Sequence, residues 1–157
     1  DFNLKLVKLK REKPQFKNLK YKKILSYLSK MDNSKSDIAL VSNKKILETG
    51  TSNLLFVKNQ KFFTPKKDYY EGNTYKFFKT KIKRIGKKDI LVKELNDYDE
   101  ILLIGSGKGV TSVRTINELN WKRKNLNKFK FLSNQYNVAI NECDTYRFWE
   151  KEIIYQP

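Results

Sequence analysis

Short apolar runs separated by turn residues dominate the first half of the chain. Residues 1–10 alternate apolar and polar positions, which predicts a strand that ends before Pro14. Further strands are predicted at residues 37–41, 46–48, 53–57 and 61–63. Because each of these strands follows the previous one after a short turn, we expect them to form an antiparallel meander.

Three segments have apolar residues at helical spacing. The first covers Ile24 to Leu28, the second covers Tyr75 to Ile85 and ends at Gly86, and the third covers Phe131 to Tyr146. The residues expected to pack from the third helix are Tyr136, Val138, Ile140 and Tyr146. A short strand is predicted at residues 88–94 and a polar, basic loop at residues 117–130.

The stretch from Ile101 to Val113 is the most informative part of the chain. Four apolar residues predict a buried strand, the small residues of 105–109 break it, and Val110 to Ile116 predicts a second strand. A glycine-rich turn between strands lets backbone N–H groups and a serine hydroxyl approach an anion. The turn is therefore either a phosphate-binding site or an ordinary tight turn.

Two better-known phosphate loops do not fit this stretch. The dinucleotide-binding pattern must open a helix, whereas the residues after Gly109 are strand-like. The P-loop needs Ser or Thr directly after its Gly-Lys pair, but Gly109 follows Gly107-Lys108. Both patterns are excluded.

Composition narrows the class of protein. The 157 residues suit one domain with a real core, and 39% hydrophobic with 13% aromatic content excludes wholesale disorder. No apolar run approaches the roughly 20 residues that span a membrane. The single cysteine, Cys143, excludes an internal disulfide framework and suits a reducing compartment. Without histidine, His-based triads and most zinc sites are excluded, and no metal is expected.

The formal net charge of +17 suggests binding to nucleic acid, but the type of basic residue does not. Only five of the 34 basic residues are arginine, and 29 are lysine. Arginine is the residue that recognises phosphate or guanine through two parallel hydrogen bonds. We therefore interpret the charge as a general lysine bias and expect weak polyanion binding without specific nucleic-acid recognition.

Four further landmarks lie upstream of the glycine-rich turn. They are Lys17 followed by Tyr21, then Glu48, then Asn53-Leu-Leu-Phe56, then Gly72-Asn73-Thr74. Each has a bland interpretation, because a lysine or glutamate is a surface residue by default and Thr74 could simply cap a helix. Together with Gly105-Ser106-Gly107, their order and spacing resemble the class IV pyridoxal-phosphate aminotransferase family over roughly residues 14–113. Within it, the resemblance is to the 4-amino-4-deoxychorismate lyases.

The resemblance implies a fold and an assembly. The fold is α/β, the larger domain of a fold type IV enzyme, with a mostly antiparallel or mixed sheet that closes toward a barrel and is flanked by helices. Residues 1–157 would form this single C-terminal domain, and the family's smaller N-terminal domain, on the order of a hundred residues, would be absent from the chain. A homodimer in the cytoplasm is expected.

The resemblance also implies pyridoxal 5′-phosphate as the cofactor and gives roles to individual residues. Lys17 would form the Schiff base and carry protons, and Glu48 would keep the pyridine nitrogen protonated. Tyr21 would form a hydrogen bond with the ring hydroxyl. The phosphate would be held by Asn73, Thr74, Gly105, Ser106 and Gly107. Asn53 would be a strand-junction residue rather than a ligand.

The implied reaction converts 4-amino-4-deoxychorismate to 4-aminobenzoate and pyruvate, a step of folate biosynthesis. Alternatives are a D-amino-acid or branched-chain aminotransferase, a non-catalytic relative and, more distantly, a basic nucleic-acid-binding module.

The chain departs from the family pattern at Lys20, where many relatives have Asn, and at Thr49, where Gly often follows the Glu. Ser112 replaces a frequent Pro. In the family that the chain resembles, the smaller N-terminal domain supplies an arginine to the cofactor phosphate and much of the substrate pocket. We therefore expect the chain alone to bind cofactor poorly, as a processed or truncated piece would.

Overall fold

The computed structural model of the chain describes residues 1–16 and 21–142. The elements in chain order are β1 (Phe2–Lys8), α1 (Lys22–Leu28), β2 (Ser36–Ser42), β3 (Lys45–Thr49), β4 (Asn53–Lys58), β5 (Lys61–Pro65), α2 (Asn73–Lys81), β6 (Ile85–Lys88), β7 (Ile90–Leu91), the 3₁₀ helix η1 (Val92–Asp97), β8 (Glu100–Gly105), β9 (Gly109–Ile116), the 3₁₀ helix η2 (Asn117–Leu119), β10 (Trp121–Lys122) and α3 (Asn127–Asn141). None of these helices combines the length and the apolar character needed to cross a membrane.

The ten strands of the described chain form one mixed sheet. Their order is β6-β5-β4-β8-β9-β1-β2-β3-β7, with β10 paired to β9. The pairs β1–β2, β1–β9 and β5–β6 are parallel, and the other pairs are antiparallel. Strand β9 joins the two halves of the sheet, because residues 109–112 pair with β8 while Val113 and Thr115 pair with β1.

The sheet curls around one interior, which confirms the predicted mixed sheet that closes toward a barrel. In β4, Leu54 and Phe56 face this interior, as do Ile101 and Leu103 in β8. The alternate residues of both strands pack on the other face, against α2 and α3. A strand covered on both faces needs a continuous apolar run, which is why neither strand shows an alternating pattern.

The predicted meander is wrong in one respect. The hairpins β2–β3 and β4–β5 form as expected, and both central residues of the turn at Asn59 and Gln60 have positive φ, at 50° and 62°. Strands β3 and β4, however, do not pair: β3 lies beside β7, and β4 lies beside β8. Residues 50–52 form a compact turn instead of a hairpin loop, and this turn sends the chain from one half of the sheet to the other.

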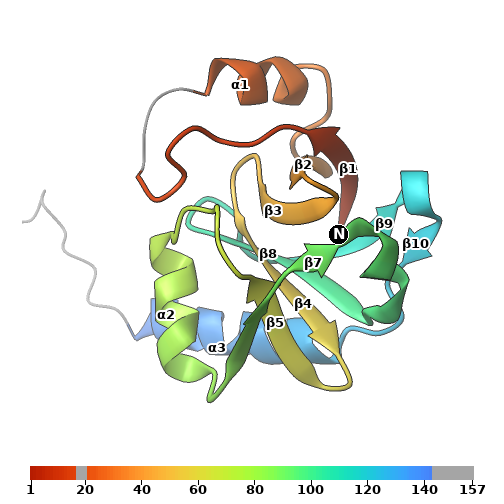
Figure 1. Ribbon diagram of the computed structural model, residues 1–157. Coiled ribbons are helices and arrows are strands. Elements are labelled where there is room, and N and C mark those ends of the chain that lie inside the picture. The colour runs from red at the N-terminus through yellow and green to blue at the C-terminus, as the bar shows by residue number, and fades with distance from the viewer. Residues whose placement is uncertain (17–20, 143–157) are drawn as a thin grey trace, which may run out of the picture.

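Helix α1 covers one end of the sheet, at the top of Figure 1. Its buried residues, Ile24 and Leu28, pack against Val7 of β1 and against Ile38 and Leu40 of β2. The predicted helix from Ile24 to Leu28 is thus confirmed, and Tyr21, which directly precedes α1, packs against the same cluster.

The second predicted helix is shorter than expected. Helix α2 ends at Lys81, and Ile82 is already extended, with φ −92° and ψ 116°. Gly86 does not end the helix, because it lies in β6 and pairs with Phe63 of β5. A Cβ at Gly86 would lie 2.9 Å from the Phe63 ring, so glycine permits this close approach. The strand predicted at 88–94 is only the two residues of β7, followed by η1.

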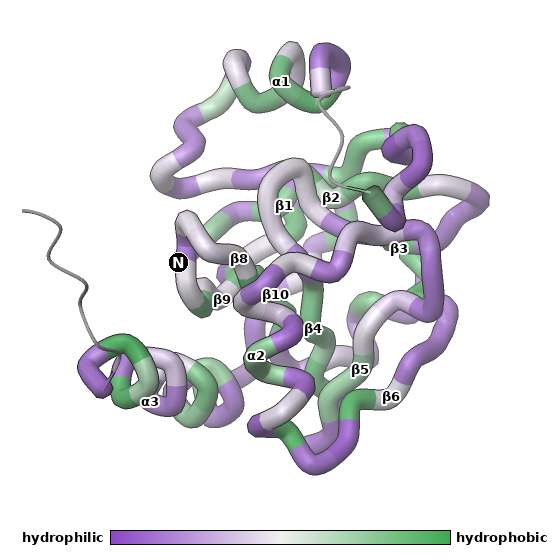
Figure 2. The backbone as a smooth tube through the Cα atoms, turned by 90° about the vertical axis from the view of Figure 1, so that its left-hand side faces the viewer, coloured by the Kyte–Doolittle hydropathy of each residue, from purple (hydrophilic) through white to green (hydrophobic). Residues whose placement is uncertain are grey.

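The third helix begins earlier than predicted. Helix α3 starts at Asn127, inside the segment predicted to be a loop, and Leu132 is its buried residue. Tyr136 packs against the core as expected, whereas Val138 and Ile140 are exposed at 44% and 51%. Figure 2 shows hydrophobic and hydrophilic residues alternating along α3. The predicted end at Tyr146 lies outside the described residues.

Candidate active site

A cavity of about 420 Å³ lies between α1, residues 48–53, the segment before α2 and the glycine-rich turn at residues 105–107. Its volume falls within the range of about 300–1,000 Å³ that is typical of small-molecule sites. Of the predicted site residues, the cavity is lined by Tyr21, Glu48, Asn73, Gly105, Ser106 and Gly107. Thr74 does not line the cavity, but its hydroxyl forms a hydrogen bond with that of Ser106, and Lys17 lies outside the described residues.

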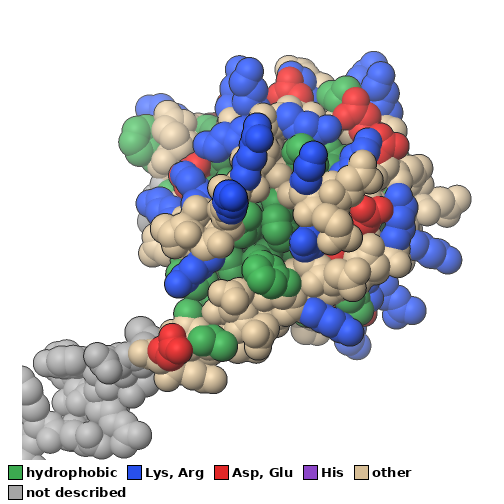
Figure 3. Space-filling view, turned by 90° about the horizontal axis from the view of Figure 1, so that it is seen from below, with side chains coloured by type: hydrophobic (Ala, Val, Ile, Leu, Met, Phe, Trp, Pro, Cys, Tyr) green, Lys and Arg blue, Asp and Glu red, His purple; other side chains and the backbone are tan. Residues whose placement is uncertain are grey.

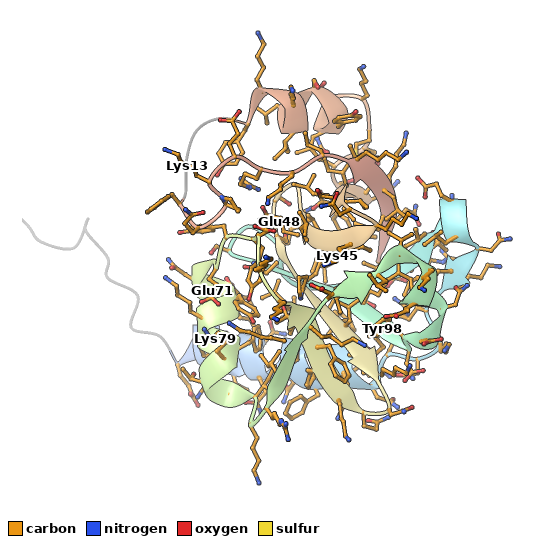
Figure 4. The ribbon with its side chains drawn as sticks, viewed as in Figure 1. Lys13, Lys45, Glu48, Glu71, Lys79 and Tyr98 are labelled. Carbon is orange, nitrogen blue, oxygen red and sulfur yellow. The ribbon has the colours of Figure 1, made fainter. Side chains whose placement is uncertain are left out.

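Glu48 forms the buried end of the cavity. It is the penultimate residue of strand β3 and is only 3% exposed, and Figure 4 shows it near the middle of the molecule, between α1 and α2. Its Oε1 accepts a hydrogen bond from Arg11 Nε at 2.8 Å, and its Oε2 accepts one from the Tyr70 N–H at 3.3 Å. Burial raises the pKa of Glu48, while the charge of Arg11 and these hydrogen bonds oppose the rise.

Arg11 is a site residue that the sequence analysis missed. It is 8% exposed, its guanidinium carbon lies 4.6 Å from the centre of the Tyr21 ring, and Nη2 lies 3.5 Å from the Gly50 carbonyl oxygen. The signal that could have found it is its type, because arginine is rare in this lysine-rich chain. An arginine beside a buried carboxylate and an aromatic ring makes a planar contact that lysine cannot reproduce.

The other end of the cavity is polar and open. The hydroxyls of Thr74 and Ser106 lie 3.2 Å apart, which joins the start of α2 to the turn between β8 and β9. The first α-helical hydrogen bond of α2 runs from the Lys76 N–H to the Gly72 carbonyl, at 2.9 Å. The N–H groups of Asn73 and Thr74 therefore precede the helical hydrogen bonds and are available to an anion at the helix N-terminus.

The three glycines of the turn between β8 and β9 differ in the space around them. A Cβ on Gly105 would lie 2.8 Å from Ser52 Oγ, so a larger residue would require the Ser52 side chain to move. A Cβ on Gly107 would have no described heavy atom within 4 Å. Gly109 has a φ of +60°, and a Cβ there would lie 2.8 Å from the Tyr136 ring. The turn is thus narrow where it meets the protein and open at Gly107.

Asn53 connects the two ends of the site. Its Nδ2 donates to the Tyr70 carbonyl, and its Oδ1 accepts from the Gly72 N–H at 3.0 Å. These contacts hold the segment before α2 against the start of β4. Asn53 also lines the cavity, so it is both a junction residue and part of the wall.

The two ends suit the two ends of pyridoxal 5′-phosphate. An ionised carboxylate offers about four lone-pair sites, and Arg11 and Tyr70 use two of those on Glu48. The carboxylate can therefore still accept a hydrogen bond from a protonated ring nitrogen. The hydroxyls and helix N–H groups at the open end are the donors that a phosphate needs. The residues present fit the group.

Comparison with known proteins gives the family of the chain. Residues 2–116 match the family described as amino-transferase class IV. No curated protein sequence matches the chain.

Solved structures share the fold at low sequence identity. A 4-amino-4-deoxychorismate lyase from Pseudomonas aeruginosa is 16% identical with a TM-score of 0.70, over 92% of this chain and 56% of that one. A branched-chain amino acid aminotransferase from Thermobaculum terrenum, in its PLP form, is 18% identical with a TM-score of 0.75, over 90% and 52%. A branched-chain aminotransferase from Thermoproteus uzoniensis, solved with norvaline, is 16% identical with a TM-score of 0.75, over 88% and 50%. The chain thus spans about half the length of the structures it matches.

Proposed function

Because the chain belongs to the class IV aminotransferase family, we propose that its cavity binds pyridoxal 5′-phosphate and that the protein is a 4-amino-4-deoxychorismate lyase. The observation that carries the proposal is the cavity itself, which is lined by the buried Glu48 and by Ser106, whose hydroxyl lies 3.2 Å from that of Thr74. When bound, the cofactor supplies an electron sink for breaking bonds at the carbon that carries the substrate amine.

The residues of the chain would divide the work by position. Glu48 would accept a hydrogen bond from the ring nitrogen and hold the proton there, and Arg11 would favour the ionised carboxylate that this role needs. Ser106, Thr74 and the N–H groups at the start of α2 would bind the phosphate. Lys17 would be the amine that anchors the cofactor and moves the proton of the substrate.

Two sequence features support the lyase over the aminotransferase. They are the Gly105-Ser106-Gly107 turn and the Asn53-Leu-Leu-Phe56 segment, both of which resemble the lyases. The lyase releases pyruvate as the remaining ring becomes aromatic, so it needs no second substrate. A branched-chain aminotransferase is the second candidate, favoured by the solved structures of that activity with the same fold.

Two measurements test the proposal on the intact protein. We expect the protein to show the visible absorbance of a lysine-bound cofactor and to lose it in Lys17→Ala, with Lys30→Ala as the matched control at an exposed lysine of the described chain. Pyruvate release without a keto acid separates the lyase from the aminotransferase. Absence of the band refutes cofactor binding, and amine transfer to keto acids without pyruvate release refutes the lyase.

We also propose that residues outside this chain complete the substrate pocket and that the protein is a homodimer. The completion of the pocket is supported by the span of the chain, which is about half of the matched structures, and the dimer follows from the family resemblance alone. Sedimentation of the intact protein at the mass of a monomer would contradict the dimer.

A further inference from the structure

The carboxylate of Asp37 is completely buried behind the cavity, and it is not one of the cavity's wall residues. Its Oδ1 accepts the Ile38 N–H at 2.7 Å. Its Oδ2 accepts hydrogen bonds from the Thr49 hydroxyl at 3.1 Å, from the Thr51 hydroxyl at 2.8 Å and from Lys108 Nζ at 2.7 Å. Asp37 is therefore the centre of a network that joins β2, the end of β3 and the turn between β8 and β9.

Lys108 fixes the glycine-rich turn from both its backbone and its side chain. Its N–H donates to the Gly105 carbonyl at 3.1 Å, and its carbonyl accepts the Thr111 hydroxyl at 3.2 Å. The side chain is 18% exposed, and Nζ lies 4.4 Å from the centre of the Phe2 ring. The ammonium group is thus held by Asp37 and Phe2, beneath the turn.

Thr49 and Thr51 connect the same carboxylate to the other end of the site. Thr49 directly follows Glu48, and its Oγ1 accepts the N–H groups of Thr51 at 3.2 Å and Ser52 at 2.8 Å. These bonds shape the turn after Glu48. The network around Asp37 consequently sets the position of this turn relative to the glycine-rich turn.

We propose that Asp37 and Lys108 are positioning residues that hold residues 105–107 where the phosphate of the cofactor binds. This inference rests on the proposed function, in which the cavity binds pyridoxal 5′-phosphate. A buried ion pair adds little to stability over an apolar replacement, because desolvation offsets the attraction. Its use here is geometric: it ties a turn of small residues, which has few side chains of its own to pack, to the interior of the sheet.

The test compares two ligands that differ only in the phosphate. Pyridoxal has the ring and the aldehyde of pyridoxal 5′-phosphate but lacks its phosphate, so it reports on the ring end alone. In the intact protein, Lys108→Met is expected to weaken the affinity for pyridoxal 5′-phosphate about tenfold, which corresponds to the loss of roughly one hydrogen bond to a charged group. The affinity for pyridoxal is expected to stay unchanged. Spectral titration gives both values.

Lys45→Met is the matched control. Lys45 lies on β3 (Figure 4), pairs with Asp89 at 2.6 Å and does not line the cavity, so its loss removes an ion pair that is more exposed and belongs to another part of the sheet. We expect neither affinity to change in this variant. Lys108→Arg keeps the positive charge, so this variant is expected to retain most of the wild-type preference for the phosphorylated ligand.

A double variant separates positioning from stability. Asp37→Asn with Lys108→Met removes both charges, so no unpaired buried charge remains, and its melting temperature is expected to exceed that of Lys108→Met. The preference for pyridoxal 5′-phosphate should stay low in the double variant. The inference alone is overturned if Lys108→Met or the double variant keeps the wild-type preference for pyridoxal 5′-phosphate over pyridoxal. It is also overturned if either variant loses affinity for both ligands equally. A wild-type protein that binds neither ligand overturns the proposed function with it.

Discussion

Glu48 is a carboxylate that the fold buries almost completely, and a single arginine accompanies it. An ionised carboxylate in such a place is costly unless charge and hydrogen bonds compensate. Arg11 supplies both, and its guanidinium also stacks near Tyr21. At the scale of the residue, the chemistry of the site therefore depends on a pair whose two members lie 37 positions apart in the sequence.

The first prediction concerns the pH dependence of this pair. In Arg11→Gln, burial acts on Glu48 without the opposing charge, so the pKa of Glu48 should rise further above its ordinary value. Because the proposed role needs the ionised carboxylate, the acidic limb of the pH profile of pyruvate release should move to higher pH. Arg84→Gln, at an exposed arginine, is the control. An acidic limb that stays in place while activity is retained would contradict the role of Arg11.

The same shift has a consequence for stability. A carboxyl whose folded pKa lies above its unfolded value of 4.5 binds its proton more tightly in the folded state. The free energy of unfolding should therefore fall as the pH rises from 4.5 through the folded pKa, and then level off. Arg11→Gln should widen this pH window, which denaturant titrations at a series of pH values would show.

At the scale of the element, the start of α3 depends on a residue of the sheet. Glu100 of β8 is fully buried, and its two carboxylate oxygens accept the N–H groups of Lys128 at 2.8 Å and Phe129 at 2.9 Å. A carboxylate in this position satisfies two N–H groups of the first turn and interacts favourably with the helix dipole. Helix α3 consequently begins inside a polar segment that has little helical pattern of its own.

The second prediction follows from this cap. Glu100→Ala should lower the free energy of unfolding by about 2 kcal/mol and speed the hydrogen exchange of the Lys128 and Phe129 amides. Asp97→Ala is the control, because Asp97 makes an exposed ion pair with Lys58 and its loss should cost clearly less stability than the loss of Glu100. Equal effects of the two substitutions would show that Glu100 does not cap the helix.

At the scale of the whole molecule, the charge of +17 is spread out. Figure 3 shows Lys and Arg side chains distributed over the visible face instead of forming one stripe. Several basic groups are also already paired with carboxylates, including Arg11 and Lys108 at the site. A distributed charge attracts polyanions without selecting among them.

The third prediction is that oligonucleotide binding by the intact protein is weak and non-specific. We expect a dissociation constant on the order of 10⁻⁴–10⁻⁶ M near physiological salt and a steep loss of affinity as salt rises. Polyglutamate should compete, because only charge is recognised. Tight binding that depends on the base sequence and resists polyglutamate would favour the nucleic-acid alternative over the enzyme.

The strands of the fold were predictable because their signals are local. The runs that became β4 and β8 are apolar throughout, and the turn at residues 59–60 sits between two such runs. The order of the strands was not predictable in the same way, because the pairing of β4 with β8 joins segments that lie far apart in the sequence. For the same reason, the start of α3 depended on Glu100, whose partners Lys128 and Phe129 lie 28 and 29 positions further along the chain.

By itself, the sequence determined which residue types stand at which spacing, and through their resemblance to the class IV family these residues led us to expect Glu48, Thr74 and Ser106 at one site. Their motifs are short and each is read along one stretch of backbone. Only the tertiary structure decided that Arg11 completes the site and that Asp37 and Lys108 hold it from behind. The physical reason is that a buried charge selects its partner by distance in space, and 71 residues separate Asp37 from Lys108 along the chain.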